Sequence, residues 1–156
     1  MEVPSLSRRI IWFDFDPNFN KSMHLFLAAY RKDIDIVLAE DEQKVLELVQ
    51  TADIRVVITN LMIPKMYGAV LVKELVDLVI NERWDGRIAM VTNNIAAGED
   101  YLCRNEVDKT ERGIPVFLRP RGNNDIYDIL AQIGFGISSP VALQSLATSA
   151  AAVGNA

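Results

Sequence analysis

Five short segments rich in apolar and β-branched residues recur along the chain, at residues 9–15, 34–39, 54–60, 87–92 and 114–120. A stretch with helical spacing of apolar residues follows each of them. The pattern is clearest over residues 67–82, and weakest over 96–110, where polar residues dominate. Strands that are buried on both faces of a parallel sheet are nearly continuously apolar, and residues 54–60 come closest to this pattern. The alternation therefore predicts an α/β fold with a parallel sheet and helices on both faces.

Crossover connections between parallel strands are right-handed, which leaves few possible topologies. For five strand–helix units the common solution is the doubly wound, flavodoxin-like strand order 2-1-3-4-5. Ligand chemistry in that order gathers at the carboxyl ends of strands 1 and 3, where the winding direction reverses. We expect one domain over residues 1–135. Residues 136–156 are rich in Ala, Ser and Gly and are expected to form a flexible tail.

The bulk composition narrows the possible partners and compartments. A net charge of −5 and a pI near 4.9 argue against binding of nucleic acid through phosphate neutralisation. The chain contains no apolar run that approaches the ~18 residues of a membrane span, and the first nine residues do not resemble a signal peptide. The single cysteine, Cys103, excludes an internal disulfide. We therefore expect a cytoplasmic protein.

Polar side chains stand where four of the five predicted strands end. They are Asp14 and Asp16 after the first strand, Asn60 after the third, Thr92 after the fourth and Arg119 after the fifth. Polar residues at such positions often only cap helices, and capping alone explains Asp16, because Pro17 follows it. The other side chains are expected to meet at one edge of the sheet.

Four motifs at these strand ends resemble response-regulator receiver domains, the modules of two-component signalling. NLMIPKMYG, from Asn60 to Gly68, is similar to the D-x-M-M-P-x-M-x-G segment of that family. FDFDPNF resembles the acidic turn after the family's first strand, VTN carries the threonine after the fourth, and LRP stands where the family has lysine-proline. The resemblance covers about residues 8–134, with the motifs in order.

The resemblance implies a role for each matching position. The family binds Mg²⁺ with two adjacent acids after strand 1 and with the strand-3 aspartate, which then accepts a phosphoryl group. The acid pair falls on Asp14 and Phe15, the phosphoacceptor on Asn60, the hydroxyl on Thr92 and the lysine on Arg119. Two of these five positions keep the family's residue type and three depart from it.

The three departures all weaken phosphate chemistry. A carboxamide is a poor nucleophile, so Asn60 is not expected to form an acyl phosphate. Asp14, with Phe15 beside it, is expected to bind Mg²⁺ poorly, because this cation prefers carboxylate oxygens. Arg119 keeps a positive charge and can pair with Asp14 or with the Asn60 carbonyl. The Asn60 amide is expected to hydrogen-bond to Thr92 or Arg119.

The family's switching aromatic is also missing, because its position is occupied by Val116. The resulting expectation is a stand-alone degenerate receiver that signals by protein contact, is not an enzyme, and needs no metal or other cofactor. The resemblance places its partner surface on the fourth helix, fifth strand and fifth helix, with a homodimer as one possibility.

Two alternatives stay open at this point. Asp14-Phe15-Asp16 also resembles the D-x-D motif of haloacid-dehalogenase-type phosphatases, in which Asp14 would be the nucleophile. That family needs a later pair of acids, whereas the fifth strand ends in Arg119-Pro120-Arg121. A flavodoxin-like module that binds a small ligand is the other alternative. It is disfavoured because DPNFN offers no glycine or hydroxyl for a phosphate loop.

Overall fold

The computed structural model describes residues 8–60, 67–104 and 113–136. The chain divides into two compact units, Met1–Arg119 and Pro120–Ala156, and each is described by itself. The segment expected to form a flexible tail lies, from residue 137 onward, outside the described residues. That expectation stays a prediction.

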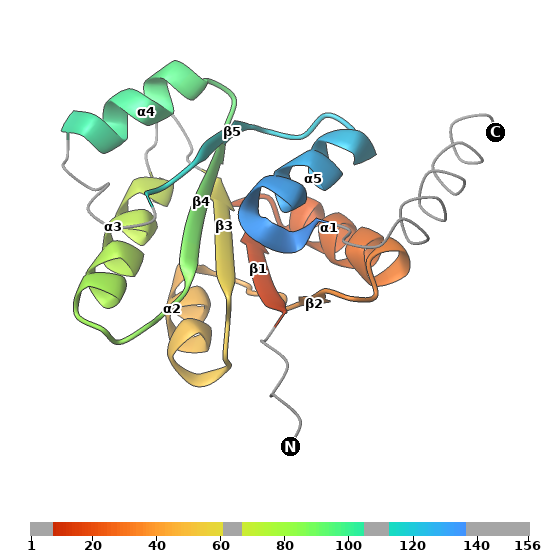
Figure 1. Ribbon diagram of the computed structural model, residues 1–156, viewed down its shortest axis with the longest axis horizontal. Helices are drawn as coiled ribbons and strands as arrows, with labels where there is room; N and C mark the ends of the chain where they lie inside the picture. Colours follow the sequence, from red (N-terminus) through yellow and green to blue (C-terminus); the bar gives the residue numbers. More distant parts are fainter. Residues whose placement is uncertain (1–7, 61–66, 105–112, 137–156) are drawn as a thin grey trace. The chain divides into compact units, whose positions relative to one another are not determined.

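The first unit contains a five-stranded parallel sheet in the order β2-β1-β3-β4-β5, as predicted (Figure 1). The strands are β1 (Arg9–Phe13), β2 (Asp35–Ile36), β3 (Val56–Asn60), β4 (Arg87–Thr92) and β5 (Val116–Leu118). The two edge strands, β2 and β5, are shorter than their apolar segments suggested. Each of them pairs with one neighbour only, so fewer of its residues are held in the ladder.

Four helices of the first unit connect these strands: α1 (Pro17–Tyr30), α2 (Glu42–Thr51), α3 (Tyr67–Ile80) and α4 (Ile95–Arg104). Helix α1 lies on one face of the sheet, and α2 and α3 lie on the other (Figure 1). The helix start predicted at Asp16 is confirmed, and Asp41 caps the next helix in the same way. The Asp16 carboxylate accepts the Asn18 N–H at 2.9 Å, and the Asp41 carboxylate accepts the Lys44 N–H at 2.8 Å.

The main apolar core of the first unit lies between the sheet and helices α2 and α3. Ile11 and Phe13 of β1, Val45 of α2, and Leu71 and Leu75 of α3 are buried in it. These positions alternate along β1 and follow helical spacing along α3, which is why the sequence pattern identified them. This core holds the sheet in place, and the sheet positions the polar residues at the ends of its strands.

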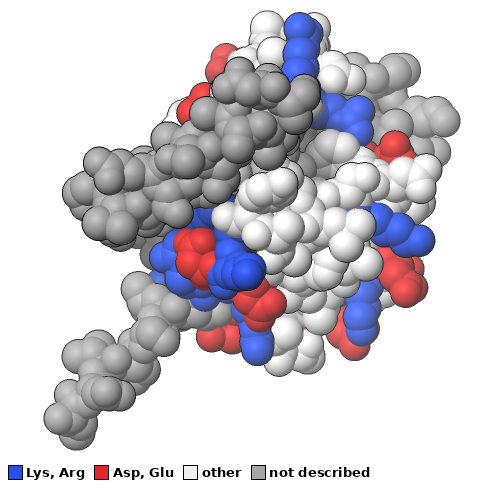
Figure 2. All heavy atoms as spheres, turned by 90° about the vertical axis from the view of Figure 1, so that its right-hand side faces the viewer, with Lys and Arg blue, Asp and Glu red and all other residues white. Residues whose placement is uncertain are grey.

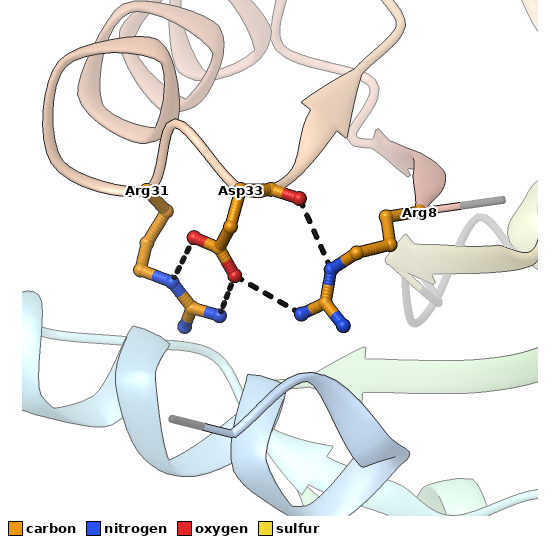
Figure 3. A network of polar contacts seen from close by, with 3 residues as sticks. All are labelled: Arg8, Arg31 and Asp33. Carbon is orange, nitrogen blue, oxygen red and sulfur yellow. Dashed lines mark hydrogen bonds and ion pairs between the residues drawn. The ribbon is translucent and has the colours of Figure 1, made fainter. Parts of the chain in front are cut away.

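A network of two arginines and one aspartate joins the start of β1 to the end of α1 (Figure 3). The guanidinium of Arg31, which is only 2% exposed, pairs with both carboxylate oxygens of Asp33 at 2.9 and 2.8 Å. Arg8 donates to the same carboxylate and to the Asp33 carbonyl, both at 3.0 Å. The hydrogen bond and charge of Arg31, with a further contribution from Arg8, lower the pKa of Asp33 despite its partial burial.

The second unit begins with α5 (Asn123–Leu130), which continues into a π-helical turn, η1 (Ala131–Phe135). Ile126, Ile129, Leu130 and Ile133 are buried, as their helical spacing predicted. Gly134 has a φ of 96°, a left-handed conformation that glycine adopts without strain.

Charge on the surface is mixed. Figure 2 shows acidic and basic side chains next to one another, without a continuous basic area on the face in view. This distribution agrees with the low pI and gives no support to nucleic-acid binding on that face. Within the described residues, no helix is long and apolar enough to cross a membrane.

Candidate functional site

The carboxyl ends of the strands bring three of the predicted site residues into direct contact. Asp14 directly follows β1, Asn60 is the last residue of β3, and Arg119 directly follows β5. The side chains of Asn60 and Arg119 both reach Asp14. The contacts span the sheet from β1 to β5, although these positions are up to 105 residues apart in sequence.

The Asp14 carboxylate, in a residue that is only 3% exposed, accepts two hydrogen bonds and forms one ion pair within the protein. Its Oδ2 accepts the Asn60 amide Nδ2 at 2.8 Å and lies 3.2 Å from Nη2 of Arg119. Its Oδ1 accepts the Asp16 backbone N–H at 2.9 Å. A buried carboxylate is stable only when it is paired and hydrogen-bonded. These donors satisfy the charge of Asp14 without any external ligand.

Asn20 holds the main chain of Asp14, a role that the sequence analysis missed. The Asp14 N–H donates to Asn20 Oδ1 at 2.8 Å, and Asn20 Nδ2 donates back to the Asp14 carbonyl at 2.8 Å. The side-chain amide thus takes the place of a neighbouring strand where β1 ends. The available signal was a polar residue on the inner face of α1, close to Met23 and Leu27.

Arg119 is fixed by three contacts. Its backbone N–H donates to the Thr92 carbonyl at 2.9 Å and extends the pairing of β5 with β4. Its guanidinium pairs with Asp14 and also lies over the ring of Phe19 on α1, 4.8 Å from the ring centre. The side chain remains 31% exposed. Arg119 therefore joins β5 to the start of α1 across the strand ends.

Thr92 is buried, but its hydroxyl is used locally. It accepts the Asn94 N–H at 3.2 Å in the turn that leads into α4. The hydrogen bond that we expected from Asn60 to Thr92 or Arg119 is made to Asp14 instead. The physical reason is that a buried carboxylate attracts the amide N–H more strongly than a neutral hydroxyl does, and a guanidinium has no acceptor for that N–H.

Solved structures with this arrangement of strands and helices were found, whereas no family model and no curated protein matches the sequence. One is the Vibrio cholerae chemotaxis protein CheY4, with a TM-score of 0.64 and 16% identity over 81% of this chain and 98% of that chain. Another is the non-phosphorylated HemR receiver domain of Leptospira biflexa, with a TM-score of 0.61 and 16% identity over 86% of this chain and 98% of that chain. A third is the Thermotoga maritima response regulator TrrA in complex with Mg²⁺-BeF, with a TM-score of 0.59 and 15% identity over 81% of this chain and 98% of that chain.

The chain has the receiver fold. The fold predicted from the strand pattern and from the four motifs is thus confirmed. At 15–16% identity the likeness establishes the fold, and the chemistry has to be argued from the side chains of this chain.

Two positions that depart from the receiver motif are occupied by apolar packing residues. Phe15 is half-buried against the main core, and its ring meets that of Phe13 edge-on at 5.2 Å. Val116, at the position of the switching aromatic, also packs against that core and lies under α4. A Cβ added at Gly98 of α4 would come within 3.0 Å of Val116 Cγ1 and 3.3 Å of Thr92 Cγ2. Helix α4 therefore packs closely on β4 and β5 at Gly98.

The donor set does not fit the Mg²⁺ site that the receiver fold implies. Mg²⁺ requires carboxylate and water oxygens in octahedral geometry, and a receiver supplies them from acids at the positions of Asp14, Phe15 and Asn60. Here one acid remains, and its Oδ2 is occupied by a guanidinium and an amide N–H. Among residues 8–60, 67–104 and 113–136, no group of three or more His, Cys, Asp or Glu side chains could hold a metal ion.

A pocket of about 130 Å³ adjoins the site, and its lining includes Phe13, Asp14 and Phe15 together with Glu40, Asp41 and Glu42 at the start of α2. Burial, together with the carboxylates of Glu74 and Asp41, raises the pKa of Glu42. In the sequence these acids stand out only as a cluster of negative charge at a helix start, where the helix dipole favours them. The structure shows that they also line the pocket beside Asp14.

Proposed function

We propose that this chain is a degenerate receiver domain that takes part in signal transduction through protein contact, without accepting phosphate at Asn60. One observation carries the proposal. The side chains at the phosphoacceptor and lysine positions both bind the remaining acid, through a hydrogen bond of 2.8 Å from Asn60 and an ion pair of 3.2 Å from Arg119. Two of the departures from the family motif, Asn60 and Arg119, therefore both bind the acid that the motif retains.

The amide at Asn60 cannot perform the first chemical step of a receiver. Phosphoryl transfer to this position requires a carboxylate oxygen as the nucleophile, and a carboxamide oxygen is far less nucleophilic. The amide nitrogen is in addition committed to Asp14. A phosphodonor would therefore meet no attacking carboxylate at Asn60 and no unpaired carboxylate at Asp14.

The guanidinium of Arg119 takes over the electrostatic role of a metal ion. A buried carboxylate needs a positive partner, and Arg119 supplies one within the protein. The partner is part of the chain itself, so this pairing does not depend on a cation from solution. Mg²⁺ would have to displace the guanidinium and then bind a single carboxylate, so its binding is expected to be weak.

The same contacts argue against the phosphatase alternative. An Asp14 nucleophile would need an oxygen that is free to attack, but Oδ1 accepts the Asp16 N–H, and Oδ2 accepts the Asn60 amide and forms the ion pair with Arg119. We therefore propose a non-enzymatic role. No observation favours a flavodoxin-like cofactor site, because the β1–α1 turn is closed by Asn20.

Partner contact is proposed for the surface that the resemblance indicated, namely helix 4, strand 5 and helix 5. The exposed apolar side chains of Ile95 on α4 and Leu118 on β5 support the first two of these elements. Single exposed apolar residues are common on protein surfaces, so they define no partner by themselves. The identity of the partner, a second copy included, is left to experiment.

The test is incubation with acetyl phosphate and Mg²⁺, followed by intact-mass measurement. We expect no phosphorylated species from wild type, whereas an intact receiver domain treated in parallel serves as the positive control. The Asn60→Asp variant is also expected to phosphorylate poorly, since Phe15 and Arg119 remain. In pull-downs, wild type and Asn60→Asp should retain the same partners. A stable phosphorylated wild-type protein would contradict the proposal.

A further inference from the structure

We propose that Phe19, in the first turn of α1, is a positioning residue that selects arginine at position 119 and holds its guanidinium on Asp14. The inference rests on the function proposed above, in which the pair of Asp14 and Arg119 replaces the metal site. It goes beyond that function by assigning a role to a residue of α1, since the resemblance places none of the five site residues on that helix.

The first observation that supports this role is that the Arg119 guanidinium contacts Phe19 and Asp14 at the same time. Its guanidinium carbon lies 4.8 Å from the centre of the Phe19 ring while Nη2 lies 3.2 Å from Asp14 Oδ2. The guanidinium thus lies over the ring while one of its nitrogens meets the carboxylate. A cation within about 6 Å of a ring centre is attracted by the ring's quadrupole.

The second contact fixes the helix turn that carries the ring. Asn20, the next residue of α1, exchanges two hydrogen bonds of 2.8 Å with the main chain of Asp14. Adjacent residues of one helical turn therefore hold both members of the ion pair. Asn20 fixes the main chain of the carboxylate, and Phe19 fixes the guanidinium.

This arrangement discriminates between arginine and lysine. Arginine is planar and weakly hydrated, so it can stack on a ring and donate along its edge to a carboxylate at the same time. Lysine carries a compact, strongly hydrated ammonium group on a flexible stem and cannot make both contacts equally well. Phe19 therefore gives arginine an advantage at the position where the receiver motif has lysine.

The experiment is a double-mutant cycle on the full chain, with Phe19→Leu and Arg119→Lys made singly and together. Urea unfolding gives the equilibrium constant of each protein. We expect Arg119→Lys to destabilise wild type more than the Phe19→Leu background, with a coupling of roughly two- to fivefold in the unfolding constant. If Phe19→Leu does not fold, Phe19→Met, which also lacks a ring, replaces it in the cycle.

A matched control separates this role from ordinary packing. Phe26 is also on α1 and is half-buried, but it packs against Tyr30 at 5.2 Å. Phe26→Leu should lower stability equally with arginine or lysine at position 119. Hydrogen exchange of the Arg119 side-chain N–H groups gives a second readout, which Phe19→Leu should accelerate and Phe26→Leu should not. The rescue variant Phe19→Tyr should restore both readouts.

Coupling below twofold, or the same coupling for Phe26, would overturn the inference. Neither result would affect the proposed function, which depends on the response to phosphodonor. Conversely, phosphorylation of wild type would overturn the proposed function and leave the measured coupling between Phe19 and Arg119 in place.

Discussion

The amide nitrogen of Asn60 donates a 2.8 Å hydrogen bond to the buried carboxylate of Asp14. Two acids at these positions would repel each other unless a cation lay between them. With asparagine at position 60, the same approach becomes favourable because a donor faces an acceptor. Asparagine in place of the family's aspartate thus removes the nucleophile and also stabilises the site.

Asn60→Asp should destabilise the protein at neutral pH by about 1–3 kcal/mol, because a buried hydrogen bond is replaced by repulsion between two carboxylates. The deficit should shrink as the pH falls, since protonation of one carboxyl restores a donor between the two side chains. Urea unfolding of variant and wild type at two pH values measures both effects. Equal stability at neutral pH would show that the hydrogen bond contributes nothing.

Arg119→Met should also destabilise the protein, because it keeps most of the side-chain stem but leaves the Asp14 charge without its cation. Breaking a fully buried pair costs about 3–5 kcal/mol, and we expect about 1–3 kcal/mol here because Arg119 is 31% exposed. Arg121→Met is the matched control, since Arg121 is exposed and two residues away. Its effect should stay within about 0.5 kcal/mol. Equal losses for the two variants would contradict a specific role of Arg119.

The network of Arg8, Arg31 and Asp33 predicts part of the acid sensitivity. The pKa of Asp33 is lower in the folded chain than its ordinary value of 3.8. Its ion pairs therefore stabilise the fold above that value and are lost as the pH falls through the lower folded pKa. Asp33→Asn should lower stability near neutral pH and flatten the stability profile on the acid side. An unchanged acid profile, measured by urea unfolding across that range, would contradict this account.

Gly98 tests how closely α4 packs on β4 and β5. Alanine favours helix by up to about 1 kcal/mol over glycine, but its Cβ would lie 3.0 Å from Val116 Cγ1. In wild type, Gly98→Ala should therefore leave the free energy of unfolding nearly unchanged or lower it. In the Val116→Ala background, which leaves room for the added methyl group, Gly98→Ala should raise that free energy by about 0.5–1 kcal/mol. Thermal or urea unfolding of the four proteins provides the comparison. The same effect in both backgrounds would mean that Val116 does not limit the approach of α4.

Most of the fold could be predicted from the sequence because each strand can be recognised from the apolar residues of its own segment. The central strand, Val56–Asn60, begins with a run of apolar β-branched residues, and Asp16-Pro17 marks the start of α1 through local capping chemistry. The edge strands were predicted too long, since β2 covers only Asp35–Ile36. A run of apolar residues indicates that a segment is buried. The number of its residues that pair as a strand also depends on the neighbouring strand.

The site could be predicted in part. The motifs identified Asp14, Asn60 and Arg119, and the charge of Arg119 suggested its pairing with Asp14. The partner of Asn60 was predicted wrongly, because sequence does not show which of several nearby acceptors is buried and charged. The contacts of Asn20 and Phe19 were missed for a related reason. An inward-facing helix residue resembles any other packing residue until the tertiary structure brings Asp14 and Arg119 against it.

The most direct measurement is a Mg²⁺ titration of the ¹⁵N-labelled protein, followed at the backbone amide of Asp16. That N–H donates to Asp14 Oδ1 at 2.9 Å, so any metal that binds the carboxylate has to disturb its resonance. Since Arg119 and Asn60 already satisfy Asp14, we predict no saturable shift at millimolar Mg²⁺. A saturable shift of the Asp16 resonance, with loss of protection at the Arg119 side chain, would contradict the central claim.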